Sequence, residues 1–174
     1  MIFKKNLVLI GMMGVGKSTI GKILAEKLKF GFIDTDHEIE KNENSTIKKI
    51  FDLKGEEYFR IVEEKLVLEK LKLNNVVLAL GGGSFLNSNI RRNVLKNNLS
   101  FWLDWDTNIL IERIFKSKKR PKIENLSKQE IESLKKKRDV IYQSANYKLN
   151  CTGLTKNQIT NKIIELYENK KNKN

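Results

Sequence analysis

The sequence reads Gly11-Met12-Met13-Gly14-Val15-Gly16-Lys17-Ser18 between an apolar run at residues 7–10 and an amphipathic stretch at residues 20–28. This segment has the pattern G-x-x-x-x-G-K-S, with an expected strand before it and an expected helix after it. Its glycines let successive backbone N–H groups point inward around phosphate oxygens. Lys17 then reaches the β- and γ-phosphates, and the Ser18 hydroxyl can ligate Mg²⁺. Because both structural flanks are present, the segment predicts a nucleoside-triphosphate site rather than a coincidental glycine turn.

Length and composition limit the class of protein. With 174 residues and 40% apolar content, the chain suits one compact domain, residues 1–174. The sequence contains no apolar run of membrane-spanning length and no pattern of a secretory signal, so we expect a cytoplasmic protein without a membrane partner. Cys151 is the only cysteine. Because no histidine pattern around it suggests an activated thiol, we expect it to be a buried small residue.

The net charge of +13 suggests nucleic-acid binding, because a basic surface attracts phosphate polyanions. The lysines, however, are scattered through nearly every segment. The few aromatic residues do not alternate with basic ones as a stacking surface for single strands would require. We therefore expect no nucleic-acid partner, and we expect a monomer that binds small molecules.

Short apolar runs alternate with longer segments of helical spacing. The expected strands cover residues 7–10, 32–34, 76–80, 100–103 and 147–151, and the expected helices lie around 20–28, 45–53, 56–73, 90–95, 109–114, 127–143 and 159–166. This alternation predicts a three-layer α/β/α fold with a central, parallel five-stranded sheet. The helical piece at about 36–73, broken at Gly55, could form a substrate-binding wall. Residues 169–174 are polar and are expected to fray.

Three special features follow three of the expected strands. The first strand ends in the glycine loop, the second in Asp34-Thr35-Asp36 and the third in Gly81-Gly82-Gly83. In an open parallel sheet, ligands bind beyond the carboxyl ends of the strands. All three features are therefore expected on one edge of the sheet, and this convergence indicates a ligand site more strongly than any single motif.

Asp34 and Asp36 lie on either side of Thr35, so in an extended chain their carboxylates would point the same way. Near a triphosphate, one could hold Mg²⁺, directly or through water, while the other accepts a hydrogen bond from an attacking hydroxyl. The alternative is that Asp36 only caps a helix that begins at His37. His37 itself is expected on the helix surface.

The three consecutive glycines exceed what a tight turn needs, although a simple turn is the alternative. They suggest a small polar ligand packed against main-chain N–H groups. Arg60 and Glu63 lie three residues apart on one helix face, where Glu63 could hold the guanidinium. A solvent-exposed ion pair is the alternative. Phe59, however, should bury this part of the helix, and a partly desolvated arginine is a good clamp for a carboxylate.

The polar loop at about residues 116–125 contains Arg120 and the only proline, Pro121. A mobile basic loop could close as a lid over the phosphates and place Arg120 on the developing charge. A merely solvated basic loop fits the pattern equally well. Arg138, in the helix-like segment 127–143, could face the site or water, and its spacing does not decide between them.

Together these segments resemble the shikimate kinase family, a nucleoside-monophosphate-kinase-like group of P-loop proteins, over residues 7–151. The matching positions are the loop at 11–19, Asp34-Thr35-Asp36, Ile50, Phe51, Gly55, Glu56, Phe59, Arg60, Glu63, Gly81-Gly82-Gly83, Arg113, Arg120, Pro121, Arg138, Tyr142 and Ala145. The resemblance implies transfer of the ATP γ-phosphoryl to the 3-hydroxyl of shikimate. The products would be ADP and 3-phosphoshikimate, on the route to chorismate and the aromatic amino acids.

The resemblance also implies a role for each matching residue. The catalytic residues would be Lys17, Asp36 and Arg120, with Asp36 orienting and deprotonating the shikimate hydroxyl. The ATP-binding residues would be Gly14, Val15, Gly16, Lys17, Ser18, Thr19, Arg113 and Arg120, with Arg113 along the adenine. The shikimate-binding residues would be Asp36, Arg60, Gly81, Gly82, Gly83 and Arg138. Mg²⁺ would be held by Ser18 and, through water, by Asp34.

Three departures from the family pattern bear on these roles. Asn44 stands where the family usually has glycine, but asparagine tolerates the left-handed conformation, so the turn should survive. The expected lid lacks the usual glycines and carries extra lysines. Asp139 directly follows Arg138, and its carboxylate could draw the guanidinium partly away from the substrate.

Two other functions stay open at this point. One is a kinase of the same fold that acts on another small acceptor, such as gluconate or a nucleoside monophosphate. The other is a regulatory, nucleic-acid-binding P-loop protein that hydrolyses ATP slowly. Arg60, Arg138 and the three glycines favour an acceptor ring with a carboxylate, and a regulatory protein gives no reason for Asp36 and Arg60 to accompany the loop.

Overall fold

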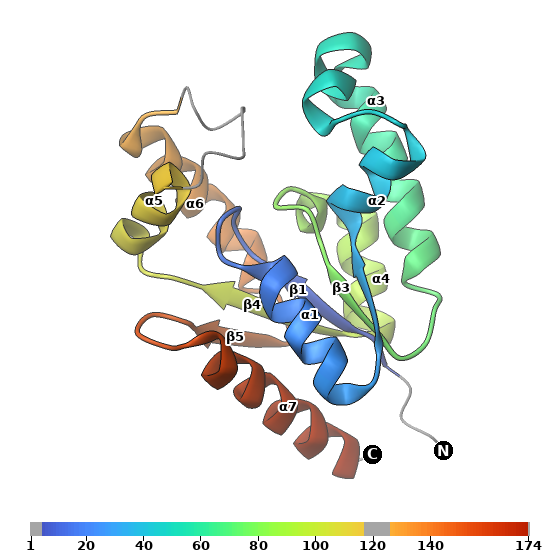
Figure 1. Ribbon diagram of the computed structural model, residues 1–174, viewed down its shortest axis with the longest axis vertical. Helices are drawn as coiled ribbons and strands as arrows, with labels where there is room; N and C mark the ends of the chain where they lie inside the picture. The colour runs from blue at the N-terminus through green and yellow to red at the C-terminus, as the bar shows by residue number, and fades with distance from the viewer. Residues whose placement is uncertain (1–4, 117–125, 174) are drawn as a thin grey trace.

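The computed structural model describes residues 5–116 and 126–173 (Figure 1). Its strands are β1 (Leu7–Ile10), β2 (Gly31–Asp34), β3 (Val76–Ala79), β4 (Leu99–Asp104) and β5 (Tyr147–Asn150). Its helices are α1 (Lys17–Leu28), α2 (Thr35–Asn42), α3 (Ile47–Lys70), α4 (Ser88–Asn97), α5 (Thr107–Lys116), α6 (Lys128–Tyr142) and α7 (Lys156–Asn172), with a 3₁₀ turn, η1 (Ser84–Leu86). The five expected strands are all present, and each end lies within about one residue of the position that the sequence predicts.

The five strands form one sheet in the order β2-β3-β1-β4-β5, and every neighbouring pair is parallel. Parallel neighbours need crossover connections, and helices supply them here. Helices α1 and α7 lie side by side over one face of the sheet, and α4 lies over the other (Figure 1). The predicted three-layer α/β/α fold is therefore confirmed.

Strand β1 lies at the centre of the sheet and is covered on both faces. Its residues Leu7, Val8 and Leu9 are fully buried. This explains why the strand reads as an unbroken apolar run rather than as an alternating pattern. The glycine loop therefore extends from a buried central strand, and the Asp34 segment extends from β2, the partly exposed strand at one end of the strand order.

Helices α2 and α3 form a projecting unit with a small core of their own, made by Ile39, Ile50, Phe59 and Leu66. Gly55 breaks α3 with φ 82° and ψ 168°, as the sequence predicts. Asn44 has φ 47°, so asparagine does support the left-handed turn before α3. The segment at about 36–73 is therefore helical, as the sequence predicts.

Residues 169–172 were expected to fray, but α7 continues to Asn172, and the Lys171 ammonium lies 3.4 Å from the Glu168 carboxylate in the last turns. Cys151 is fully buried, and burial raises the pKa of its thiol to about 12. An inert small residue, as predicted, fits this environment.

The expected lid at 116–125 lies almost entirely outside the described residues, and so do Arg120 and Pro121. Along the parts of the chain that the structure does describe, none of the helices combines the length and apolar character needed to cross a membrane.

Candidate active site

The glycine loop, residues 11–18, joins β1 to α1 and curls tightly enough for α1 to begin at Lys17. Gly11, Gly14 and Gly16 have φ values of 136°, 80° and 92°, which residues with side chains rarely adopt. Gly16 is the N-cap and has no side chain to occupy the N–H groups of the first helical turn. Those N–H groups and the positive end of the helix dipole make an anion site.

Lys17 lies at the base of this loop and is 8% exposed. Its ammonium donates hydrogen bonds to the carbonyls of Gly11, at 2.8 Å, and Met12, at 2.9 Å. A cavity of about 430 Å³ lies beside it, lined among others by Ser18, Asp34 and Asp36. The ammonium therefore lies over the base of the loop, at the edge of this cavity.

Ser18 and Asp34 both line this cavity and are in direct contact with each other. The Ser18 hydroxyl donates a hydrogen bond to Asp34 Oδ2. A hydroxyl and a carboxylate are the hard oxygen donors that Mg²⁺ prefers. In the described ranges, no three acidic, histidine or cysteine side chains cluster as a metal cage. This donor set therefore fits Mg²⁺ that takes its other ligands from phosphates and water.

The backbone around Asp36 differs from the expectation. Strand β2 ends at Asp34 and α2 begins at Thr35, so Asp36 lies in the first helical turn and not in extended chain. The alternative role for Asp36 as a cap is wrong as well, because Asp34 is the N-cap: its Oδ1 accepts from the N–H groups of Asp36, at 3.1 Å, and His37, at 3.4 Å. His37 is exposed, as expected.

Thr35, to which the sequence analysis assigned no role, holds the start of α2 in place. It is fully buried, and its hydroxyl donates to the Ala79 carbonyl at 3.2 Å and accepts from the Gly81 N–H at 3.0 Å. These bonds tie the start of α2 to the end of β3. Asp36 is thereby held beside the three glycines.

The three glycines at 81–83, called here the glycine turn, are the meeting point of the predicted acceptor residues. A Cβ added to Gly81 would lie 2.5 Å from Asp36 Oδ1, and one added to Gly83 would lie 2.8 Å from an Arg60 Nη atom. A Cβ on Gly82 would lie 3.2 Å from Arg138 Nη1. Three charged side chains, from α2, α3 and α6, thus lie against the backbone of the glycine turn. Any residue larger than glycine there would displace them.

Arg60 is held in place by two carboxylates. It bonds Glu63 at 2.7 Å and Glu56 at 2.8 Å, and Glu63 is buried. Burial lowers the pKa of Arg60, but Glu63 and Glu56 outweigh this effect and hold the pKa above its usual value. The Ser84 hydroxyl donates to the other Glu63 oxygen at 2.5 Å, which links α3 to the glycine turn. The alternative of a freely solvated ion pair is therefore wrong.

Arg138 faces the site and not the solvent, which settles what its spacing left open. Its Nη1 lies 3.8 Å from Met12 Sδ, beside the glycine loop. Tyr142, one turn further along α6, is buried and donates its hydroxyl to the Gly82 carbonyl. Burial raises the pKa of Tyr142 to about 12, so the hydroxyl stays a donor at neutral pH.

A second cavity of about 650 Å³ adjoins the first and shares Gly16, Thr19 and Arg113 with it. Arg113 Nε donates to the Gly14 carbonyl at 3.1 Å, and its guanidinium lies 4.2 Å from the Trp105 ring centre. The indole donates in turn to the Val15 carbonyl at 3.2 Å. A flat cation on an aromatic ring, next to a phosphate loop, offers a stacking surface for a base.

The sequence did not single out the other wall of this second cavity. It is formed by residues 154–157, where the chain leaves β5 and enters α7. Strand and helix patterns carry no signal that this loop and Trp105 line one cavity. The position of the segment beyond the carboxyl end of a sheet strand was the available signal.

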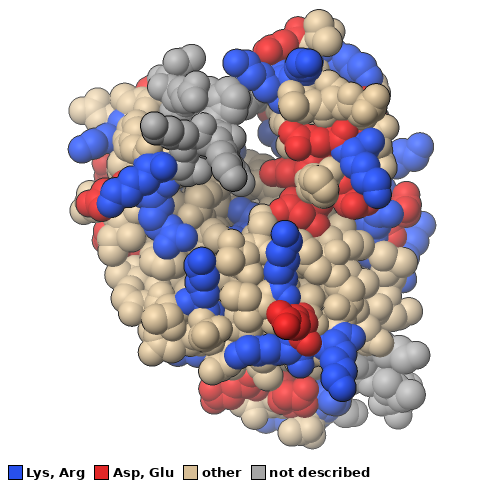
Figure 2. Space-filling view, viewed as in Figure 1, with Lys and Arg blue, Asp and Glu red and all other residues tan. Residues whose placement is uncertain are grey.

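Charge is distributed unevenly around the site. Figure 2 shows Asp and Glu side chains gathered over α2 and α3, on one wall of the central hollow. Lys and Arg are spread over the same view of the described residues and interspersed with acidic ones. The acidic wall suits a metal ion and a proton acceptor, and the dispersed lysines resemble a solvated surface rather than a nucleic-acid track.

Comparison with known proteins identifies the family that has this arrangement. The family model described as shikimate kinase matches residues 13–168. The chain belongs to the shikimate kinase family. The shikimate kinase of Persephonella marina is 41% identical over 160 residues, which cover 92% of this chain and 97% of that protein. A solved shikimate kinase from Acinetobacter baumannii, in complex with shikimate, matches with a TM-score of 0.89 and 31% identity over 95% of this chain and 94% of that one.

As a member of the shikimate kinase family, the protein is a kinase that uses ATP. More distant kinases share the architecture only. A gluconokinase from Sinorhizobium meliloti matches with a TM-score of 0.57 at 16% identity, which shows the fold alone. Family membership therefore favours the activity of shikimate kinases over the two alternatives, a gluconate kinase and a regulatory nucleic-acid-binding protein.

Proposed function

We propose that this site transfers the γ-phosphoryl of ATP to the 3-hydroxyl of shikimate, with ATP on the glycine loop and the acceptor on the glycine turn. Membership in the shikimate kinase family supports the reaction. One geometric observation carries the division of roles: Asp36, Arg60 and Arg138 meet at the glycine turn, at the sheet edge where Lys17 holds the phosphate loop.

The acceptor side follows from charge and shape. Arg60 and Arg138 are forked cations that can hold the carboxylate of the substrate, and the bare backbone of the glycine turn lets its ring approach closely. Asp36 then accepts a hydrogen bond from the 3-hydroxyl and takes its proton as the oxygen attacks the γ-phosphorus; the bond from that phosphorus to the bridging oxygen breaks, and ADP leaves. Positioning and charge neutralisation do most of the work in such a transfer.

The donor side uses the two adjoining cavities. Lys17 and the N–H groups at the start of α1 bind the β- and γ-phosphates, with Gly14, Val15 and Gly16 of the loop and Thr19 of α1 around them. Arg113, stacked on Trp105, offers its open face to the adenine. Ser18 and Asp34 would hold Mg²⁺, Asp34 through water. When bound, the ion neutralises charge on the phosphates.

Several further assignments are part of the same proposal. Arg120 would be the lid cation that reaches the transferring group, although it lies outside the described residues. We also propose that residues 1–174 act as one domain, and that the enzyme is a cytoplasmic monomer without nucleic-acid or membrane partners. Sedimentation at working concentration tests the monomer directly.

The acceptor assignment can be tested with the purified protein. ADP release in a coupled assay is expected to require shikimate, ATP and Mg²⁺ together. Gluconate, a nucleoside monophosphate and a mixture without acceptor serve as parallel controls. Turnover with gluconate or the nucleotide, and none with shikimate, would contradict the proposal.

Gly83→Ala should weaken shikimate binding by displacing Arg60. The backbone at Gly83 has φ −102°, which alanine tolerates, so the added methyl acts by contact with the guanidinium at 2.8 Å. We expect the KM for shikimate to rise about tenfold, because charge-assisted hydrogen bonds are lost, while the KM for ATP stays unchanged. Gly31→Ala is the control, since a Cβ there meets its nearest neighbour at an ordinary 3.6 Å. Equal shikimate KM values for the two variants would argue against Arg60 as a ligand.

A further inference from the structure

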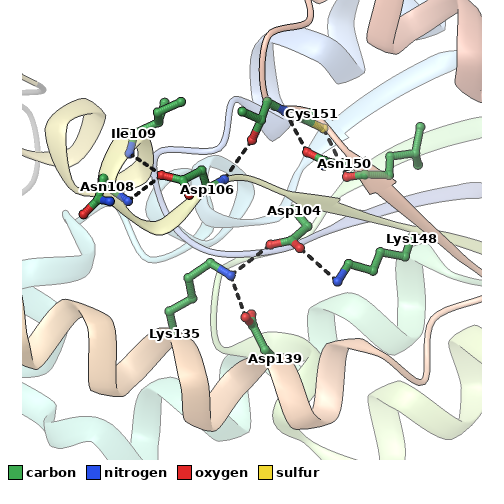
Figure 3. A network of polar contacts seen from close by, with 11 residues as sticks. Asp104, Asp106, Asn108, Ile109, Lys135, Asp139, Lys148, Asn150 and Cys151 are labelled. Carbon is green, nitrogen blue, oxygen red and sulfur yellow. Dashed lines mark hydrogen bonds and ion pairs between the residues drawn. The ribbon is translucent and has the colours of Figure 1, made fainter.

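Four charged side chains form a chain of ion pairs between α6 and the sheet, outside the residues assigned to substrates. Lys135 on α6 bonds Asp104 Oδ1 at 2.9 Å and Asp139 Oδ2 at 2.5 Å. The second Asp104 oxygen pairs with Lys148 of β5 at 3.0 Å. Figure 3 shows Asp104 between the two ammonium groups, with Asp139 below Lys135. Two cations and two anions alternate, so the chain is neutral.

Lys135 is the central member of this chain and the most unusual one. It is 7% exposed, and lysine is seldom buried unless it is paired. Burial lowers the pKa of Lys135, but Asp139 and Asp104 outweigh this effect and hold the pKa above its usual value. The ammonium therefore stays charged and bridges the two carboxylates.

The ion pairs fix α6 at the point where it presents Arg138. Asp104 ends β4, and its backbone carbonyl accepts from the Cys151 N–H at 2.8 Å, so it belongs to the rigid end of the sheet. Lys135 and Asp139 are one helical turn apart and share the β4 side of α6. Arg138 lies between them in sequence and reaches the glycine turn instead.

Asp139 is the member that could disturb the site. Burial raises the pKa of its carboxyl, and Lys135 only partly opposes this. Among residues 5–116 and 126–173, Asp139 Oδ1 and Arg138 Nε are buried atoms without a hydrogen-bond partner. An underbonded carboxylate and an underbonded guanidinium thus stand on neighbouring residues, and it is Lys135 that holds the other Asp139 oxygen.

We propose that Lys135 is a positioning residue for shikimate binding: by bridging Asp104 and Asp139, it keeps the Asp139 carboxylate on the β4 side of α6 and leaves Arg138 to the substrate. This inference rests on the proposed function, in which Arg138 holds the substrate carboxylate. It also answers the concern raised by the sequence, because the neighbouring carboxylate is occupied by a lysine one turn earlier.

The test removes the lysine with and without the carboxylate that it holds. Lys135→Met is expected to raise the KM for shikimate about tenfold, with kcat and the KM for ATP within about threefold of wild type. Adding Asp139→Asn to Lys135→Met removes the competing carboxylate and restores neutrality. The double variant is expected to return the shikimate KM to within about threefold of wild type.

Two surface lysines provide matched controls for the same chemical change. Lys136→Met alters an exposed residue of α6 that pairs with Glu132, and Lys148→Met removes the exposed partner of Asp104. Both are expected to keep the wild-type KM for shikimate. Melting temperatures of all variants are measured in parallel, and the double variant carries the test if Lys135→Met alone folds poorly.

The outcomes separate the positioning role from the proposed function. An unchanged shikimate KM in Lys135→Met, or a rise that Asp139→Asn does not reverse, overturns the positioning role. A double variant that keeps a high shikimate KM overturns it as well. Arg138→Met is measured beside them: if it leaves the shikimate KM unchanged, the assignment of Arg138 to the substrate fails first.

Discussion

Asp36→Asn is expected to lower kcat by about 10²- to 10⁴-fold while the KM values for ATP and shikimate stay within about threefold. The Asp36 carboxylate lies against the glycine turn, 2.5 Å from where a Gly81 side chain would begin, and lines the same cavity as Lys17. Asparagine keeps the size and the place in the first turn of α2 but cannot take a proton. The loss should therefore fall on the chemical step, as measured by steady-state ADP release.

Glu38→Gln is the control for this substitution, because Glu38 lies in the same first turn of α2 and undergoes the same loss of charge. It should keep the wild-type kcat, which would separate proton transfer from any general effect of acidic residues at this helix start. If Asp36→Asn retained a near-normal kcat with an unchanged melting temperature, Asp36 would not be the base. A parallel rise in both KM values would indicate a disturbed site instead.

The sheet and the glycine loop could be predicted from sequence because local patterns determine them. Strand β1 is buried on both faces and so reads as a short apolar run, and the loop needs glycines at positions of positive φ. The meeting of Asp36 with the glycine turn was also predictable in outline, because the ends of parallel strands share an edge. Such inferences require only topology and no side-chain contact.

The parts that sequence could not give depend on contacts between distant segments. Helical spacing does not say whether Arg138 faces water or the site, because it does not show which neighbour covers a face. The contacts of Arg138 with Met12 and beside Gly82 decide it. The position of the Asp139 carboxylate depends on Asp104, 35 positions away, because Lys135 bridges the two side chains. The extended conformation expected for Asp36 was wrong. Either aspartate could cap the helix by residue type, and in the structure Asp34 takes that position, so Asp36 lies in the first helical turn.

Lys17→Met is expected to lower kcat/KM for ATP by about 10³-fold, because one charged donor to the transferring phosphates is lost. Methionine keeps the length and the apolar stem of the side chain, so packing at the start of α1 is preserved. The ammonium bonds the carbonyls of Gly11 and Met12, and these bonds place it over the base of the loop. The change should appear in both kcat and the affinity for ATP, measured by initial rates and by titration with nucleotide.

Lys22→Met supplies the control, since Lys22 lies on the exposed side of the same helix and loses the same charge. It should leave kcat/KM for ATP unchanged, so that an effect of Lys17→Met cannot be ascribed to the net charge of the protein. The KM for shikimate is informative as well. The charged side chains that meet at the glycine turn come from α2, α3 and α6, whereas Lys17 lies on α1, so shikimate binding should survive the substitution. A Lys17→Met variant with wild-type kcat/KM for ATP would mean that the phosphates do not lie on the glycine loop.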